Sequence, residues 1–291
     1  MPATVLDLIR SITGADCGAL PLSLCTLPRP YLLERQGLSA TEGTVCMMAI
    51  PYVMTEDVDD PRRNLSLYAV PRDYHLFFDE LKASLIPALQ AAYPQRTFAL
   101  FADHSPVGEI QAAARAGLGT VGMNGLLITP RYGSFVFLGE VITDATWEEV
   151  AGADAPLPDP STPLPTCEGC GACVRACPAG CNEGDRTSCL SALTQKKGAL
   201  TPEEATALDR HPPVWGCDVC QTACPHNRRV ICEDIDTPIP FFREERIIRM
   251  DAATLATMSD EDFAHRAYAW RGRGVIGRNI QRKETAERST T

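Results

Sequence analysis

Thirteen cysteines are present, and seven of them lie in two short runs that each end in Cys-Pro. The first run is C-x2-C-x2-C-x3-C-P, from Cys167 to Pro178, and the second is C-x2-C-x3-C-P, from Cys217 to Pro225. Three cysteines at such spacings wrap three corners of a 4Fe–4S cubane, and the fourth corner is reached from elsewhere in the chain. The pattern therefore predicts two 4Fe–4S clusters and electron-transfer chemistry.

The ligand sets follow from the way the two runs complete each other. In a run of the first type, the fourth cysteine crosses to the other cluster. The second run is one cysteine short, and Cys189 is available to complete it, with Cys181 as the plausible substitute. We expect Cys167, Cys170, Cys173 and Cys224 to bind one cluster, and Cys177, Cys189, Cys217 and Cys220 to bind the other.

A pair of zinc sites is the main alternative, because C-x2-C pairs also bind zinc tetrahedrally. Zinc ribbons use separated pairs and need neither three evenly spaced cysteines nor a terminal Cys-Pro, so the spacing favours clusters. The remaining cysteines are expected to be core thiols or bystanders: Cys17, Cys25, Cys46, Cys181 and Cys232.

The composition is that of a globular protein, with 45% hydrophobic and 22% charged residues among 291. A net charge of −10 argues against a surface that binds nucleic acid everywhere. A local patch remains possible, because residues 266–283 carry six Arg and Lys and no acidic residue. This basic tail would either hold a nucleic acid or pack as a surface helix on the cysteine-rich part.

The location of the chain is expected to be cytoplasmic, without a membrane. No apolar run approaches the length of a membrane span. The N-terminal residues predict an amphipathic helix with Val5, Leu6, Ile9 and Ile12 on one face, and not a signal peptide. A reducing compartment makes metal binding by the cysteines more favourable than disulfides.

The chain order predicts an α+β fold. Residues 1–143 should form an α/β domain with a buried strand at 44–54, a helix at 73–93 that Pro87 kinks or ends early, and a core strand at 96–103. Ser105 should cap a short helix that ends at Gly117. A strand pair is expected from 126–129 and 133–143.

Three further parts follow the first domain. Residues 144–166 are expected to form a stiff, extended linker that is acidic and rich in proline. Residues 167–232 form the double-cluster domain, and residues 233–291 are expected to be a helical, basic tail.

The segment ADHSPVGEIQAAARAGLGTVGMNGLLITPRYGSFVFLGEVITD (102–144), followed by this cysteine pattern, resembles the epoxyqueuosine reductase family. The resemblance extends to YAVPRDYH (68–75), GCDVCQTACPHN (216–227) and WRGRGVIGRNI (270–280). It implies a cobalamin-dependent iron–sulfur reductase, related to reductive dehalogenases, that reduces the epoxide of epoxyqueuosine in tRNA to give queuosine. It also implies a nitroreductase-like N-terminal domain, a bacterial-ferredoxin-like cluster domain, a corrin between the two, and an external reductase, ferredoxin or flavodoxin as electron donor.

The resemblance assigns the family's proton donor, the Asp of a D-x-x-P motif, to Asp103. A carboxylic acid at a strand end and near an apolar corrin face would have a raised pKa and could donate a proton. The alternative from the residues alone is that Asp103 only caps the helix that follows.

Further corrin contacts are expected from Tyr74, His75, Gly119, Met123, Asn124, Ser134 and Phe135, although core packing accounts equally well for Tyr74. Residues 117–122 fit G-x-G-x-x-G, but they follow a helix and precede a strand, which is the reverse of the dinucleotide-binding order. Their glycines are expected to allow a tight turn and a close approach of the backbone to the corrin. The resemblance implies no histidine below the cobalt, and His226 is expected to tune a cluster.

Three departures from the family pattern bear on the substrate. Met123 stands where the family usually has Lys, His104-Ser105 stands where small residues are usual, and the chain stops at Thr291, where many members continue into helical repeats. Two alternatives therefore stay open: the same machinery acting on a small molecule, or a two-cluster electron-transfer protein without a corrin. The large N-terminal part argues against the second.

Overall fold

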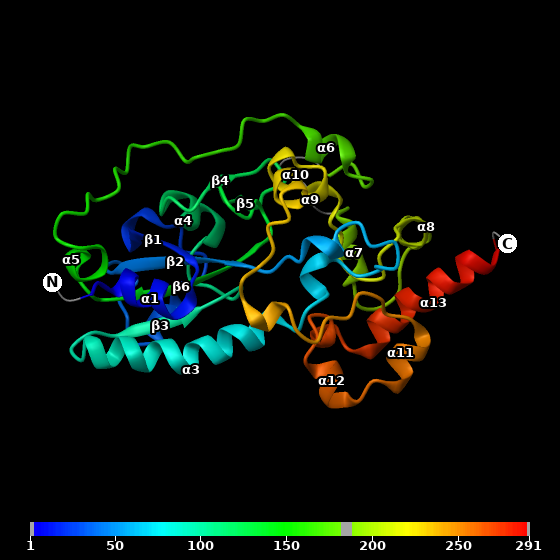
Figure 1. The fold of residues 1–291 in the computed structure, drawn as a ribbon, viewed down its shortest axis with the longest axis horizontal. Helices are drawn as coiled ribbons and strands as arrows, with labels where there is room; N and C mark the ends of the chain where they lie inside the picture. The colour runs from blue at the N-terminus through cyan, green and yellow to red at the C-terminus, as the bar shows by residue number, and fades with distance from the viewer. Residues whose placement is uncertain (1–2, 182–187, 290–291) are drawn as a thin grey trace. The chain divides into compact units, whose positions relative to one another are not determined.

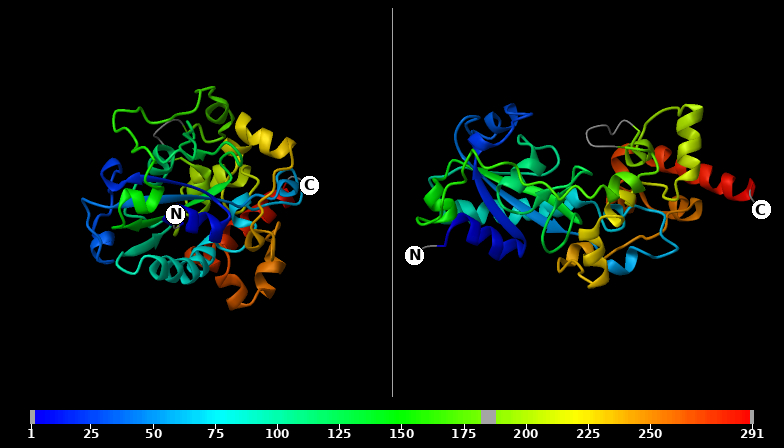
Figure 2. Two further views of the ribbon diagram at one scale, coloured as in Figure 1. Left: turned by 60° about the vertical axis from the view of Figure 1, so that its left-hand side comes forward. Right: turned by 90° about the horizontal axis from the view of Figure 1, so that it is seen from above.

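The computed structural model describes residues 3–181 and 188–289 (Figures 1 and 2). The chain divides into two compact units, Met1–Pro51 with Phe77–Gly169, and Tyr52–Leu76 with Cys170–Thr291. The sequence predicts a contiguous first domain over 1–143, whereas the segment 52–76 groups with the cysteine-rich unit.

The first unit is built around a four-stranded antiparallel sheet, which confirms the mixed helix and sheet class. Its strand order is β1-β2-β6-β3, and the register pairs Met48 with both Cys17 and Gly139, and Glu140 with Phe101. The strands are β1 (Asp16–Pro21), β2 (Thr44–Pro51), β3 (Phe98–Phe101) and β6 (Val136–Thr143). β2 is buried along its whole length, as its continuous apolar sequence predicts.

Helices cover both faces of this sheet (Figure 1). α4 (Glu109–Arg115) packs its buried alanines against one face, and α3 (Tyr74–Ala92) covers the other, where Phe78 lies directly over Gly139. A Cβ at Gly139 would lie 2.3 Å from the Phe78 ring, so only glycine fits there. The other helices of this unit are α1 (Val5–Thr13), α2 (Tyr31–Glu34) and α5 (Trp147–Ala151).

The helix α3 runs through Pro87 to Ala92 and does not end early, which leaves a kink at Pro87 as the remaining expectation. Three other expectations about local structure are wrong. α4 begins after Gly108, so Ser105 does not cap it. β5 (Leu127–Ile128) pairs with β4 (Thr120–Val121) and not with β6; only an isolated Thr129–Gly133 bridge closes the turn between β5 and β6. The linker is also not extended throughout, because Thr146 caps the helix α5 within it.

The second unit is helical in the part that the structure describes. Its apolar core joins residues far apart in sequence, because Leu65 of the segment 52–76 bridges to Trp215, which packs on Tyr268. Its α-helices are α6 (Ala172–Ala176), α7 (Leu190–Thr194), α8 (Pro202–Arg210), α9 (Val219–Thr222), α10 (Pro225–Cys232), α11 (Ala252–Thr257), α12 (Asp260–Ala264) and α13 (Arg273–Ser289). Among the described residues, no helix combines the length and apolar character that a membrane span requires.

Candidate functional site

The first cysteine run starts at the end of the first unit. Thr166 forms a parallel bridge with Val121, and the Cys167 amide donates to the Val121 carbonyl at 3.0 Å. From Cys170 onward the run belongs to the second unit, where Gly171 at φ 70° starts α6. The Arg175 side chain donates to the Cys170 carbonyl at 2.9 Å and so fixes this loop.

The second cysteine run lies on α9 and at the start of α10. Cys224 is the N-cap of α10 and Pro225 its first residue, which gives the Cys-Pro pair a structural reason. Burial raises the pKa of the Cys224 thiol, whereas hydrogen bonds from the backbone amides of His226 and Asn227 act in the opposite direction. Amides at a helix N-terminus stabilise a thiolate, which is the form that binds iron.

The cysteines of the second unit lie near one another. The pKa of Cys217 is raised to about 11, mainly by burial; a hydrogen bond from the Val219 amide opposes the shift, and Asp218 and the thiols of Cys189 and Cys177 add to it. Cys224 has Cys173 and Cys170 as its thiol neighbours. Burial raises the pKa of Cys220 to about 12, and its neighbours come from both sets: Cys217, Cys189, Cys173 and Cys177. Cys220 therefore lies near members of both predicted sets, and the division of the eight cysteines between two clusters stays a prediction.

Single-ion sites are a separate question. Within residues 3–181 and 188–289, no group of three or more His, Cys, Asp or Glu side chains is arranged to hold one metal ion. Such a site, for example tetrahedral zinc, would require sulfurs at about 2.3 Å from the ion. Part of the loop between Cys181 and Cys189 lies outside the described residues.

Asp218, between Cys217 and Cys220, anchors the second run to the segment 52–76. Its buried carboxylate accepts hydrogen bonds from the Arg63 guanidinium at 2.7 Å, the Leu67 amide at 3.0 Å and the Ser66 hydroxyl. Gly216, at φ 73°, makes room for this contact, since a Cβ there would lie 2.3 Å from the Ser66 Cβ. Asp218 cannot be recognised from the sequence, because one acidic residue beside a cysteine carries no spacing signal.

Asp103 follows β3, where the sequence predicts it, in an exposed position and with a left-handed backbone at φ 63°. It does not cap α4, whose N-cap is Gly108, so the capping alternative is wrong. Its amide instead donates to Glu109 Oε1 at 3.1 Å. A left-handed non-glycine residue costs energy and is found preferentially at functional sites.

Two glutamates behind Asp103 were not singled out in the sequence. Glu140 on β6 is fully buried and accepts a hydrogen bond from the Ser105 hydroxyl, while Glu109 begins α4. Burial raises the pKa of Glu109 to about 7 and holds that of Glu140 well above its ordinary value, with the charge of Glu109 adding to the effect on Glu140. The available signal was one acidic residue in the apolar strand FVFLGEVIT.

The predicted corrin contacts fall into two groups. Tyr74 and His75 start α3 in the second unit; their rings stack at 4.2 Å, and His75 Nδ1 lies 2.8 Å from Asp73 Oδ1. The first unit holds the others. These are Gly119, Met123 and Asn124 around β4, and the buried Ser134 and Phe135 before β6.

Gly119 has a structural reason of its own. A Cβ at this position would lie 2.2 Å from the Ile128 carbonyl oxygen, so the neighbouring backbone already requires glycine. Asn124 shapes the hairpin turn, because its side-chain oxygen accepts from the Leu126 amide at 3.2 Å. Gly117, at φ 81°, forms the tight turn that the sequence predicts.

The basic tail is largely engaged inside its own unit. Arg273 donates to the Met258 carbonyl at the end of α11, and Arg278 donates to the Lys196 carbonyl. Arg282 pairs with Asp209 at 2.7 Å, and Lys283 donates to the Asp209 carbonyl at 2.9 Å. These contacts favour the surface-helix interpretation of the tail. Trp270 remains exposed, and the guanidinium of the half-buried Arg271 lies 3.6 Å from its ring centre.

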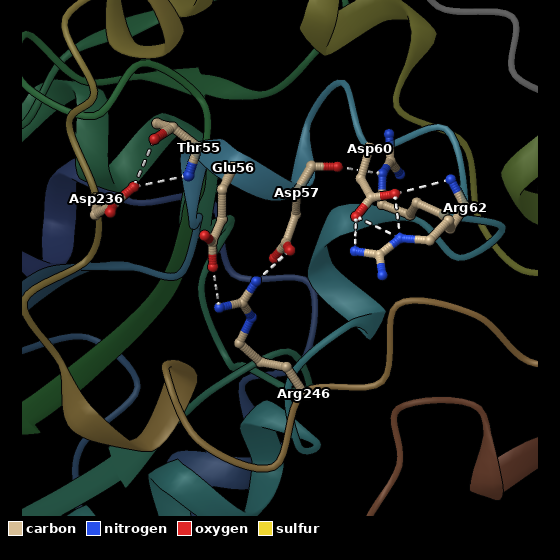
Figure 3. A network of polar contacts seen from close by, with 8 residues as sticks. Thr55, Glu56, Asp57, Asp60, Arg62, Asp236 and Arg246 are labelled. Carbon is tan, nitrogen blue, oxygen red and sulfur yellow. Dashed lines mark hydrogen bonds and ion pairs between the residues drawn. The ribbon is translucent and has the colours of Figure 1, made fainter.

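An acidic hollow of about 730 Å³ lies in the second unit, near the residues drawn in Figure 3. Three of the carboxylates that line it, those of Glu56, Asp60 and Asp236, have partners within the chain. Asp236 accepts from the Thr55 amide and hydroxyl, each at 2.7 Å, and Asp60 pairs with Arg62 at 2.6 Å. Arg246 binds both Glu56, which lines the hollow, and the buried Asp57. We interpret this network as structural.

Comparison with known proteins agrees with this arrangement. Residues 166–227 match the model of a 4Fe-4S double cluster binding domain. The epoxyqueuosine reductase of Listeria monocytogenes is 35% identical over 215 residues, covering 71% of this chain and 53% of that protein. The one of Gloeobacter violaceus is 34% identical over 200 residues, covering 67% of this chain and 59% of that protein.

Solved structures show the same fold. The epoxyqueuosine reductase of Streptococcus thermophilus superposes with a TM-score of 0.73 at 22% identity, over 97% of this chain and 80% of that one. Another epoxyqueuosine reductase, solved with a modified tRNA stem loop, gives a TM-score of 0.68 at 24% identity, over 96% of this chain and 80% of that one.

Fold and cysteine module together define an iron–sulfur protein in which a 4Fe–4S binding domain accompanies an α+β unit. The chain belongs to the epoxyqueuosine reductase family, because the relative from Listeria monocytogenes is 35% identical to it over 71% of this chain. It spans about half the length of the curated relatives it matches.

Proposed function

We propose that this protein is a cobalamin-dependent iron–sulfur reductase that reduces the epoxide of epoxyqueuosine in tRNA to queuosine. Family membership together with the placement of Asp103 carries the proposal. The D-x-x-P aspartate stands at the end of β3, exposed and in a strained left-handed conformation. In this proposal the first unit is nitroreductase-like and Asp103 is the proton donor.

Two clusters would bring electrons one at a time. The proposed ligands are Cys167, Cys170, Cys173 and Cys224 for one cluster, and Cys177, Cys189, Cys217 and Cys220 for the other. The cysteine neighbourhoods and the helix amides at Cys224 support these sets. An external reductase, ferredoxin or flavodoxin would supply the electrons.

The residues of the chain fit a corrin in a limited sense. Asp103 lies in an exposed loop and not in the core, and its backbone has the left-handed conformation. It does not cap the helix that follows. We propose that Tyr74, His75, Gly119, Met123, Asn124, Ser134 and Phe135 hold the corrin. When bound, cobalamin would supply a cobalt centre that can be reduced by single electrons. Asp103 would protonate the oxygen that leaves.

The test starts with anaerobic purification and reconstitution with iron, sulfide and cobalamin, followed by iron and cobalt analysis. About eight irons and one corrin per chain are expected. Turnover is then measured with tRNA that contains epoxyqueuosine. Asp103→Asn should keep iron and corrin but lose turnover, whereas the exposed control Asp59→Asn should keep all three. Full activity of Asp103→Asn would refute the proton-donor role.

A small-molecule substrate is the second candidate, and the engagement of the basic tail in internal hydrogen bonds favours it. Binding of tRNA that weakens steeply with salt would support the tRNA substrate. No tRNA binding at low salt would support the small molecule. Eight irons without retained corrin would leave a plain electron carrier.

A further inference from the structure

The loop between β3 and α4 carries Asp103 and is held at both of its ends. At the start, the Asp103 amide donates to Glu109 Oε1 at 3.1 Å. Further along, the buried Ser105 hydroxyl donates to Glu140 and accepts from the Val107 amide at 3.0 Å. The two carboxyl groups belong to different elements, since Glu109 starts α4 and Glu140 lies in β6.

Glu140 stands in the core without an ion-pair partner among the described residues. It lies opposite Phe101 in the sheet, on a completely buried position, and its Oε2 atom has no hydrogen-bond partner in the described part of the chain. A buried charge without a cation is costly, whereas a buried neutral carboxyl costs much less. Because a buried carboxyl destabilises the core, we infer that Glu140 has a role other than packing.

The electrostatic surroundings favour a neutral Glu140. Burial is the main cause of its raised pKa, and the charge of the nearby Glu109 is the next. The pKa of Glu109 is itself raised, mainly by burial and also by the charge of Asp103, whereas the hydrogen bond from the Asp103 amide and the charge of Arg29 oppose the shift. The Cys25 thiol also lies near Glu140. A neutral Glu140 anchors Ser105 without adding a second full negative charge close to Asp103.

Resting on the proposed role of Asp103, we propose that Glu109 and Glu140 are positioning residues that clamp the proton-donor loop, Glu109 through the Asp103 amide and Glu140 through the Ser105 hydroxyl. The clamp holds the left-handed turn at Asp103 before substrate arrives.

The first readout is independent of activity. Amide hydrogen exchange is followed by mass spectrometry on peptides covering 101–110 of the full, cluster-loaded chain without substrate. Ser105→Ala and Glu109→Ala should each speed exchange of this loop roughly five- to tenfold, the equivalent of one lost hydrogen bond. Glu109→Gln and Glu140→Gln keep an oxygen acceptor and should restore near-native exchange. Ser84→Ala is the control, since its hydroxyl bonds only to carbonyls of its own helix.

Kinetics provide the second readout. Ser105→Ala should lower kcat with little change in KM, with iron and corrin content unchanged. Native exchange in both Ser105→Ala and Glu109→Ala, or faster exchange with an unchanged kcat, would overturn the clamp. Failure of the underlying function looks different: Asp103→Asn would stay active, whatever the exchange of the loop.

Discussion

Arg63 and Asp218 form a buried ion pair, 2.7 Å between Nη1 and Oδ2, that joins the segment 52–76 to the second cysteine run. The guanidinium also donates to the carbonyls of Asp57 and Leu65, so it is fixed by its own segment. Asp218 in turn holds the Ser66 hydroxyl and the Leu67 amide. The position of the loop between Cys217 and Cys220 therefore depends on residues about 150 positions earlier in the chain.

Arg63→Ala should destabilise the second unit and weaken one cluster. Removing the cation leaves the Asp218 carboxylate buried without its charge partner, which costs about 3–5 kcal/mol. We expect iron per chain to fall toward half after reconstitution, with the loss in the cluster assigned to Cys217 and Cys220. Iron analysis and electron paramagnetic resonance of the reduced protein measure this.

Arg62→Ala is the matched control for that variant. Arg62 is the adjacent arginine, and its Asp60 partner forms a pair in which the Arg62 side chain is 74% exposed. Such an exposed pair contributes little to stability because solvent screens it. Equal iron content in the two variants would show that Asp218 does not position the cluster loop.

Cys189→Ala should remove one cluster and spare the other. Cys189 is one of the thiol neighbours of Cys217. Of the four ligands expected for this cluster, it is the one that lies outside both cysteine runs. About four irons per chain are expected after reconstitution. The exposed Cys232→Ala is the control and should keep the full complement. Unchanged iron in Cys189→Ala would mean that Cys181 or another group is the ligand.

Much of this arrangement could be predicted from local sequence. The cysteine spacing, the buried strand β2, the helix α1 and the strand that ends near Asp103 each depend on periodicity or spacing within a short window. The sequence also predicts a 4Fe–4S binding domain. The match of residues 166–227 to a 4Fe-4S double cluster binding domain confirms that prediction.

The rest depends on contacts between distant residues. Nothing in the segment 52–76 indicates that Leu65 pairs with Trp215 or that Arg63 finds Asp218. The same is true of β5, whose short apolar sequence could pair with either neighbour, and which pairs with β4. Glu140 was visible as a polar residue in an apolar strand, but its partner Ser105 is known only from the fold.

Arg246→Ala should destabilise the second unit, because Arg246 serves two acidic residues (Figure 3). Burial raises the pKa of Asp57, and the hydrogen bond from Arg246 opposes that shift. Without the guanidinium, the buried carboxyl must either stay charged or take up a proton. A loss of about 3 kcal/mol is expected, measured as a lower Tm of the cluster-loaded protein.

The matched control is Arg229→Ala, which removes an arginine from a surface i,i+4 pair with Glu233. Its effect should stay below about 1 kcal/mol. If the two variants had the same Tm, the network of Figure 3 would contribute nothing beyond surface charge.

Glu109 should make stability fall as the pH rises through neutrality. Its pKa is raised from 4.5 to about 7, mainly by burial, so the folded protein keeps a proton there that the unfolded chain has already released. This contribution is fully present below the unfolded pKa and is lost as the pH rises through the folded pKa. Over that window the cost is on the order of 3 kcal/mol.

Glu109→Gln removes the titration while keeping an oxygen that can accept from the Asp103 amide. The variant should therefore gain stability relative to the native protein between pH 5 and pH 8, since Gln carries no charge to desolvate. Tm values of both proteins across this range measure the difference, with the exposed Glu42→Gln as control. A difference that stays constant with pH would show that Glu109 is already ionised throughout this range and that its pKa is not raised.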